Sequence, residues 1–284
     1  MTTTEPIHQE EQQAPQPIEQ QTQRERWRSW RALLEDAIRT PGLLHQAYRQ
    51  FPGYSMRNQL LAMAQCDERK VLPGPLGTFV FWQRLGRNVN KGERALTLCV
   101  PITIKRTNNP ALADADRTDA DAADERPEVL RGFSYRRGWF TVHQTSGPDI
   151  VLPATPAWDA TRAVAALGAT MTPFASLNGN SQGYAQPGSV SINPVAALPH
   201  KTLFHELAHV ALDHHNRSDL PSAVREVEAE SVALLLLDAL DLPGAVYSRG
   251  YLQHWLQHHE LTDGMAQRIF TVADKILSAG RAPP

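Results

Sequence analysis

Apolar residues recur at helical spacing through the first part of the chain. The pattern predicts a helix over residues 26–49, interrupted near residues 40–42, where the sequence is Thr-Pro-Gly. After a second Pro-Gly break at residues 51–53, it predicts a further helix over residues 57–64. A Pro/Gly-rich turn region at residues 72–77 then ends this helical part.

The pattern changes to that of strands in the next stretch. Residues 95–105 predict a strand, and Pro101 within it favours a sheet edge or a bulge. The preceding residues 90–93 (NKGE) predict the turn of a β-hairpin. Strand signals resume at residues 132–143. The Ala/Asp-rich residues 107–128 between them lack an apolar period, so we expect an exposed, disordered loop that interrupts one sheet.

The C-terminal half returns to helical spacing. Residues 153–156 (PATP) mark the expected boundary between two domains, 24–152 and 153–284. Residues 179–193 predict a turn-rich hairpin. Helices are predicted over residues 157–167, 199–215, 223–240 and 245–277. The expected fold class is α+β, in which a mixed helix and β-hairpin domain precedes an α-rich domain.

Composition is compatible with two modest globular domains, because 42% of the 284 residues are hydrophobic. Cys66 and Cys99 are far apart and form no CxxC pair, which argues against a disulfide framework or a thiolate zinc cluster and suits a reducing, cytoplasmic setting. Residues 1–23 are polar and are expected to be a disordered tail, not a secretory signal. No stretch of about 18 apolar residues predicts a membrane span.

The formal net charge of −2 hides a strong asymmetry. Residues 24–106 hold 15 Lys and Arg against 6 Asp and Glu, whereas residues 107–128 hold 2 against 7. Such a basic block indicates a polyanionic partner such as nucleic acid, although solvated surface charge gives the same composition.

The helix predicted over residues 199–215 contains LFHELAHV, an HExxH motif. Spacing of four residues places His205 and His209 on one helical face, so that two imidazole nitrogens can reach one ion. Zinc lowers the pKa of a bound water to about 7, and Glu206, next to His205, can take its proton as general base. An amphipathic helix without a metal could carry these residues by chance, but the motif lies in a strongly apolar helix.

A third ligand is required, and two candidates remain. Glu226 lies on the following predicted helix, four residues before Glu230, which would then hydrogen-bond a ligating histidine. This layout resembles the gluzincins, and three protein ligands leave the open position of a catalytic zinc site. The alternative is His215, at the spacing of metzincins, but Leu212 stands where those proteins need glycine. Glu228 points elsewhere, and a solvated helix face remains the alternative for all three glutamates.

Basic and aromatic residues interleave in the N-terminal half, a pattern that suits single-stranded DNA because bases stack on rings while cations follow the phosphates. Core packing is the alternative role for the aromatic residues, and His214 and His215 are expected to be exposed residues at a helix end. The residues proposed to contact DNA are Arg57, Asn58, Trp82, Arg84, Arg87, Lys91, Arg94, Arg136 and Arg137.

Several segments in order resemble the ArdC family of antirestriction proteins over about residues 30–240. They are YSMRNQLLAMAQ, FVFWQRLGR, VNKGERAL, WFTVHQTSGPDIVLP, GYAQPGSVSIN, HELAH and EVEAESVA. The resemblance implies an N-terminal single-stranded-DNA-binding domain and a C-terminal zincin-like metallopeptidase domain similar to Spartan, in a plasmid or phage setting. Some ArdC-like chains have Gly-His shortly after HExxH, where this chain has Leu-Asp-His, so His214 inherits no role.

These observations support three functions. The first is a zinc metalloprotein that binds single-stranded DNA and protects incoming mobile DNA, with a peptidase-type site. The second is a regulatory metallopeptidase that cleaves a repressor, because HELAHVALDHH and EVEAESVA are also similar to the ImmA/IrrE metallopeptidases. The third is a non-catalytic DNA-binding protein in which zinc only stabilises the fold. No sequence feature identifies a protein substrate.

Overall fold

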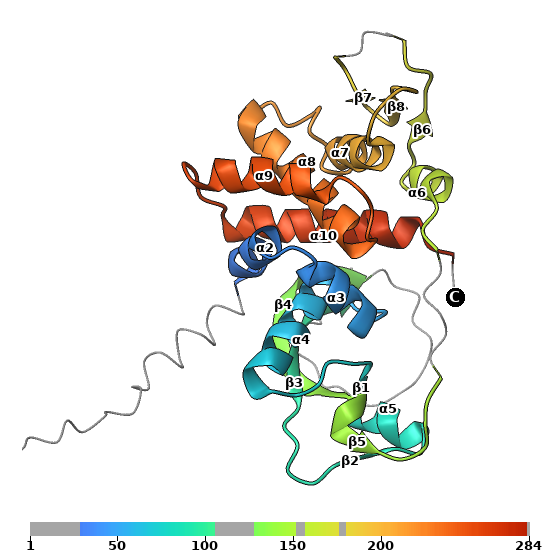
Figure 1. The fold of residues 1–284 in the computed structure, drawn as a ribbon, viewed down its shortest axis with the longest axis vertical. Helices are drawn as coiled ribbons and strands as arrows, with labels where there is room; N and C mark the ends of the chain where they lie inside the picture. The colour runs from blue at the N-terminus through green and yellow to red at the C-terminus, as the bar shows by residue number, and fades with distance from the viewer. Residues whose placement is uncertain (1–28, 106–127, 152–156, 176–179, 283–284) are drawn as a thin grey trace, which may run out of the picture.

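The computed structural model describes residues 29–105, 128–151, 157–175 and 180–282. The predicted tail (residues 1–23), nearly all of the predicted acidic loop (residues 107–128) and the predicted boundary (residues 153–156) therefore lie outside the described residues. The described chain is a mixture of helices and small sheets, which confirms the α+β class (Figure 1). None of its helices is long and apolar enough to cross a membrane.

The predicted N-terminal helix forms as two, α2 (Trp30–Arg39) and α3 (Leu43–Gln50), and α4 (Met56–Arg69) follows. The side chain of Ser29 caps α2 by accepting a hydrogen bond from the Ala32 amide. The break falls at Gly42, whose φ of 74° is in the left-handed region that favours glycine. The predicted interruption is thus confirmed, and its cause is a local turn.

A three-stranded antiparallel sheet packs against these helices. β4 (Glu128–Thr141) is central and pairs with β1 (Leu76–Thr78) on one side and β3 (Leu96–Lys105) on the other. Pro101 therefore lies on an edge strand, next to a register shift at residues 102 and 103, which confirms the prediction for this proline.

Two amide side chains of α4 cover the free edge of β3. Asn58 donates to the Cys99 carbonyl and accepts from its amide, at 2.9 and 2.8 Å. Gln65, two helical turns later, makes the same pair of bonds to Thr97, at 2.8 and 2.9 Å. Because Thr97 and Cys99 are two residues apart on the strand, the two amides replace a neighbouring strand and satisfy the backbone of this edge.

The prediction of a β-hairpin around residues 90–93 is wrong. A turn forms there, since the Glu93 amide donates to the Asn90 carbonyl at 3.2 Å, but it does not join paired strands. β2 (Asn88–Val89) pairs with β5 (Thr145–Ser146), which follows the 3-10 turn Val142–Gln144, while β3 pairs with β4. The short helix α5 (Phe79–Arg84) precedes β2 and was not predicted as an element of its own.

The C-terminal half is mainly helical with a small sheet at its edge, and the sequence predicts this combination (Figure 1). The sheet has the order β6–β8–β7, so β7 is an edge strand. The predicted last helix is divided in two, because Thr262 caps a new helix by accepting from the Met265 amide. The elements are α6 (Ala160–Ala166), β6 (Thr170–Met171), β7 (Gly183–Gln186), β8 (Ser189–Ile192), α7 (Pro199–Ala211), α8 (Ser222–Ala239), α9 (Ala245–Leu256) and α10 (Asp263–Ala279).

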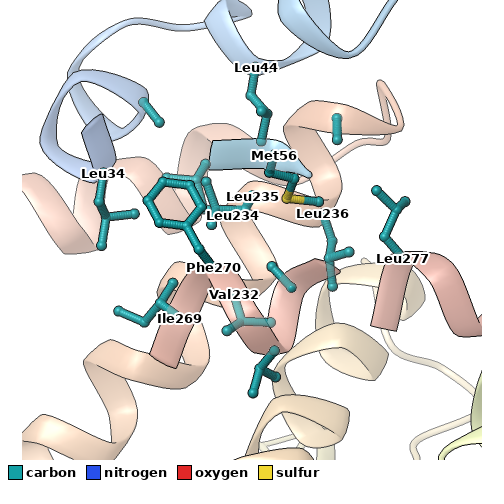
Figure 2. Close-up of a cluster of buried hydrophobic side chains, with 14 of the residues drawn as sticks. Leu34, Leu44, Met56, Val232, Leu234, Leu235, Leu236, Ile269, Phe270 and Leu277 are labelled. Carbon is teal, nitrogen blue, oxygen red and sulfur yellow. The ribbon is translucent and has the colours of Figure 1, made fainter. Parts of the chain in front are cut away.

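One hydrophobic cluster contains residues from both halves of the chain. Figure 2 shows Leu44 and Met56 of the N-terminal helices above Leu235 of α8, and Leu34 of α2 beside the ring of Phe270 of α10. Helix α8, at the centre, is buried along most of its length. The second helix of the predicted metal site is therefore fixed by packing that involves the N-terminal helices.

A buried ion pair also connects α8 and α9 to the N-terminal helices. Asp238 of α8 accepts from the amides of Gly42 and Leu44 at the start of α3, at 3.1 and 3.2 Å. Its partner Arg249 of α9, at 3.2 Å, donates to the Ala37 carbonyl at 2.6 Å, near the end of α2. The carboxylate thus lies at a helix N-terminus and the guanidinium at a helix C-terminus, where the partial charges of the backbone favour them.

Candidate metal centre

The HExxH motif lies on α7, and both histidines turn the same nitrogen towards each other. The Nε2 atoms of His205 and His209 are 3.1 Å apart. Glu226, in the first turns of α8, completes the group: its Oε2 lies 3.3 Å from Nε2 of His205 and its Oε1 lies 3.7 Å from Nε2 of His209. These three residues form the single group of at least three possible ligands found among the described residues, and His215 is not in it.

The separations fit a divalent ion of the size of zinc. Ligand atoms at about 2.0–2.1 Å from a tetrahedral centre lie about 3.3 Å from one another. The three separations in the structure are 3.1, 3.3 and 3.7 Å. The donors are two imidazoles and one carboxylate, a set that suits zinc and also other first-row divalent ions.

Electrostatics favour a cation at this position. Burial disfavours charge on His205, but hydrogen bonds with Glu226 and Glu230 outweigh it and raise the pKa of His205 to about 9. The hydrogen bond from His205 holds the pKa of Glu226 far below its usual range. In the metal-free protein a proton on His205 therefore supplies the positive charge that this group requires.

Glu206 lies beside the three donors, beneath β7. Burial raises the pKa of its carboxyl, while the charges of His205 and His209 and the backbone amide of Ala185 oppose the rise. The close approach of β7 depends on Gly183, because a Cβ there would meet Thr202 Cγ2 at 2.6 Å and the Ser191 carbonyl at 2.9 Å. A carboxyl whose pKa is shifted towards neutrality is suited to accept a proton.

Glu230 orients the first histidine. Its Oε2 lies 2.9 Å from Nδ1 of His205, and its Oε1 lies 2.8 Å from Nζ of Lys201. Burial tends to raise the pKa of Glu230, but the hydrogen bonds from His205 and Lys201 lower it to about 2. With Nδ1 donating to this carboxylate, Nε2 of His205 remains available as a ligand. Glu230 is buried, so the solvated-face alternative is wrong for this residue.

His214 is buried at 2% exposure, which corrects the expectation that it is an exposed helix-end residue. After α7, Asp213 adopts a φ of 55°, and the amides of Asp213 and His214 donate to the carbonyls of Val210 and His209 at 3.1 and 3.0 Å. This is the Schellman motif, with aspartate in place of the usual glycine. The turn returns His214 to a position beside His209, whereas His215 is exposed as expected.

Two hollows meet at the metal centre, and both are lined by His205, Glu206 and Gly183. The larger, of about 780 Å³, extends along residues 180–183 towards Lys201 and Tyr247. The smaller, of about 360 Å³, extends along Tyr184 and Ala185 and includes His215 and Arg225. The donors are thus reachable by a ligand that lies along β7.

Three of the residues predicted to contact DNA are buried, which corrects that prediction for them. Trp82 is fully buried and donates to the Phe140 carbonyl at 3.1 Å. Arg57, at 2% exposure, stacks on the Trp30 ring at 3.8 Å. Arg87, at 8% exposure, donates to the hydroxyl and the carbonyl of Thr145, both at 2.9 Å. The bonds that these cations make inside the protein explain their burial.

Of the other residues predicted to contact DNA, one is half-buried and the rest are exposed. Asn58 is half-buried, and its amide is occupied by β3 as described above. Five cations are exposed. Phe79 and Phe81 of α5, the helix that also carries Arg84, expose 47% and 40% of their surface. The exposed predicted cations are Arg84, Lys91, Arg94, Arg136 and Arg137.

Comparisons with known proteins concern the N-terminal half most directly. Residues 11–139 match the family described as the N-terminal domain of anti-restriction factor ArdC. Among solved structures, the metal-free and the Mn(II)-bound forms of antirestriction protein ArdC from plasmid R388 align with 88% of this chain and with 94% and 95% of theirs. Sequence identity is 19% in both, and the TM-scores are 0.48 and 0.49. A comparison with curated proteins finds no match. Residues 11–139 of this chain are therefore similar to the N-terminal domain of anti-restriction factor ArdC.

Proposed function

We propose that this ArdC-like protein is a zinc-dependent hydrolase of the metallopeptidase type whose N-terminal half binds single-stranded DNA, and that it protects incoming mobile DNA from restriction. The observation that supports the hydrolytic part is the triangle of three donor atoms beside the half-buried carboxylate of Glu206. His205, His209 and Glu226 would hold the ion, and His205 also lines both hollows.

A divalent ion at this centre supplies Lewis acidity, and the protein supplies the rest of the chemistry. Glu206 accepts the proton of the attacking water, because burial has raised its pKa towards neutrality. It then returns this proton to the leaving amine. Glu230 holds His205 in one tautomer throughout.

An extended peptide is the substrate class that best suits the two hollows at the metal centre. Both hollows run along β7, whose outer edge pairs with no other strand in the part of the chain that the structure describes. Backbone groups on such an edge bind a peptide as an additional strand. A peptide bound in this way would have a carbonyl beside Glu206.

The proposal for DNA binding is supported by charge and by exposed rings. The basic block of residues 24–106 contributes the exposed cations Arg84, Lys91 and Arg94, and β4 adds Arg136 and Arg137. The exposed Phe79 and Phe81 offer stacking surfaces beside Arg84. Stacking of a base on an aromatic ring contributes about 1–3 kcal/mol and needs no particular sequence.

Metal analysis and a DNA titration test the two parts separately. The wild type is expected to retain one zinc per chain after dialysis, His205→Ala to lose it, and Glu206→Gln to keep it while losing hydrolysis of a peptide library. Cleavage that persists in Glu206→Gln would reject the hydrolytic role. Retained zinc with no cleavage of any peptide would favour a structural role for the metal.

For DNA, the titration uses a fluorescent oligothymidine at several salt concentrations. Arg84→Ala is expected to weaken binding and to lower the slope of log K against log[salt] by about 0.7, the value for one phosphate contact on a single strand. Arg162→Ala, an exposed arginine on α6, is the matched control and should change neither. Absence of measurable binding at low salt would refute the DNA-binding part.

A further inference from the structure

A chain of buried polar side chains leads away from the second histidine of the centre. Nδ1 of His209 lies 2.8 Å from Nδ1 of His214, and Nε2 of His214 lies 3.1 Å from Oε2 of Glu228. The other carboxylate oxygen of Glu228 accepts from Nε of Arg268 on α10 at 3.0 Å. His214 and Glu228 expose 2% and 0% of their surface, so water does not replace these partners.

The order of donors and acceptors along this chain is determined by its ends. Arg268 can only donate, so Glu228 accepts there as a carboxylate. The other oxygen of Glu228 then accepts the Nε2 proton of His214, and in the neutral ring this leaves the lone pair of Nδ1 of His214 facing His209. The bond between the two rings therefore requires a proton on Nδ1 of His209. Its Nε2 is left unprotonated, and this is the atom that faces His205.

We propose that His214 is the positioning residue of His209 and that, through Glu228 and Arg268, it fixes the tautomer and ring orientation in which His209 binds the metal. The proposal rests on the metal centre proposed above. A carboxylate of α8 then orients each histidine of α7: Glu230 acts directly on His205, and Glu228 acts on His209 through His214. Substitution of such partners typically costs 10- to 100-fold in metal affinity.

The direction of the Glu228 side chain explains why an imidazole lies between it and His209. Glu228 and Glu230 are two residues apart on α8, so they leave the helix in different directions and only Glu230 reaches α7 directly. The turn at Asp213 brings an imidazole into the remaining gap. An imidazole can accept on one side and donate on the other, as this position requires.

The test compares zinc affinities of full-length variants by competition with a chromophoric chelator. His214→Phe keeps the ring and removes both polar atoms, so its affinity is expected to fall 10- to 100-fold. His214→Gln, which keeps one acceptor and one donor, should recover most of the loss. His215→Phe, a change of the exposed neighbouring histidine, is the matched control and should bind as the wild type does.

A second measurement does not depend on the folding of any variant. In the zinc-loaded wild type, long-range ¹H–¹⁵N correlation spectra are expected to show His209 with a protonated Nδ1 and a metal-bound Nε2. The opposite assignment would overturn the proposal, as would wild-type affinity in His214→Phe. If the wild type binds no zinc, the proposed function itself fails.

Discussion

Zinc must compete with a proton at His205, and this makes its binding dependent on pH. The pKa of His205 in the metal-free protein is raised to about 9 because hydrogen bonds with Glu226 and Glu230 outweigh the effect of burial. At pH 7 about 99% of the metal-free molecules carry this proton. Binding must displace it, so the apparent affinity should rise about tenfold per pH unit up to pH 9. The total gain from pH 7 is about 100-fold, or about 2.7 kcal/mol.

Titration calorimetry in two buffers of different ionisation enthalpy measures the protons released. Near pH 7 the account predicts the release of about one proton per zinc from His205, falling towards zero above pH 9. Glu230→Gln removes one of the carboxylates that raise the pKa of His205, so its affinity should change less steeply near pH 8. An affinity that is constant between pH 6.5 and 8.5, without proton release, would refute the reasoning.

Three further predictions concern stability and the groove. Burial raises the pKa of Asp274, which accepts from the Met56 amide, to about 7. The stability that its protonation contributes is complete below about pH 4 and is lost as pH rises through 7. Asp274→Asn should therefore raise the free energy of unfolding, measured with urea, by as much as about 4 kcal/mol more at pH 8 than at pH 4. Equal effects at both pH values would contradict this. Arg249→Ala leaves Asp238 as an uncompensated buried charge and should lower the free energy of unfolding by about 3–5 kcal/mol, and a loss below 1 kcal/mol would show that the pair is unimportant. Gly183→Ala should displace β7 and cost about 1–3 kcal/mol, with reduced hydrolysis; a crystal structure with β7 unmoved would refute it.

The sequence identified the elements of the metal site because they depend on local spacing. The separation of four positions from His205 to His209 is about one helical turn, and the apolar run of α8 predicts a buried helix. Glu226 and Glu230 share a face for the same reason. The fold class followed from the same periodicities.

The roles of His214 and Glu228 could not be predicted, because they depend on contacts that sequence spacing does not indicate. His214 is five residues after His209, a separation that brings the rings together only through the left-handed turn at Asp213. Aspartate was not recognised as the residue of that turn. Glu228 was placed correctly away from the metal, but its partner Arg268 lies 40 residues later.

The burial of predicted DNA-contact residues in the N-terminal half also depends on contacts between residues distant in the sequence. Trp82 and Phe81 are adjacent on α5, yet Trp82 is buried and Phe81 is exposed. The periodicity of a six-residue helix is too short to assign a face. Arg57 and Arg87 counted towards a basic surface because charge composition gives no information on burial. Their partners Trp30 and Thr145 lie far away in the sequence.

The most direct test of the central claim is anomalous diffraction at the zinc edge from crystals of the zinc-loaded protein. The account predicts one ion at about 2.0–2.2 Å from Nε2 of His205, Nε2 of His209 and one oxygen of Glu226. An ion bound elsewhere, or one held by the two histidines while Glu226 points away from it, would contradict the account.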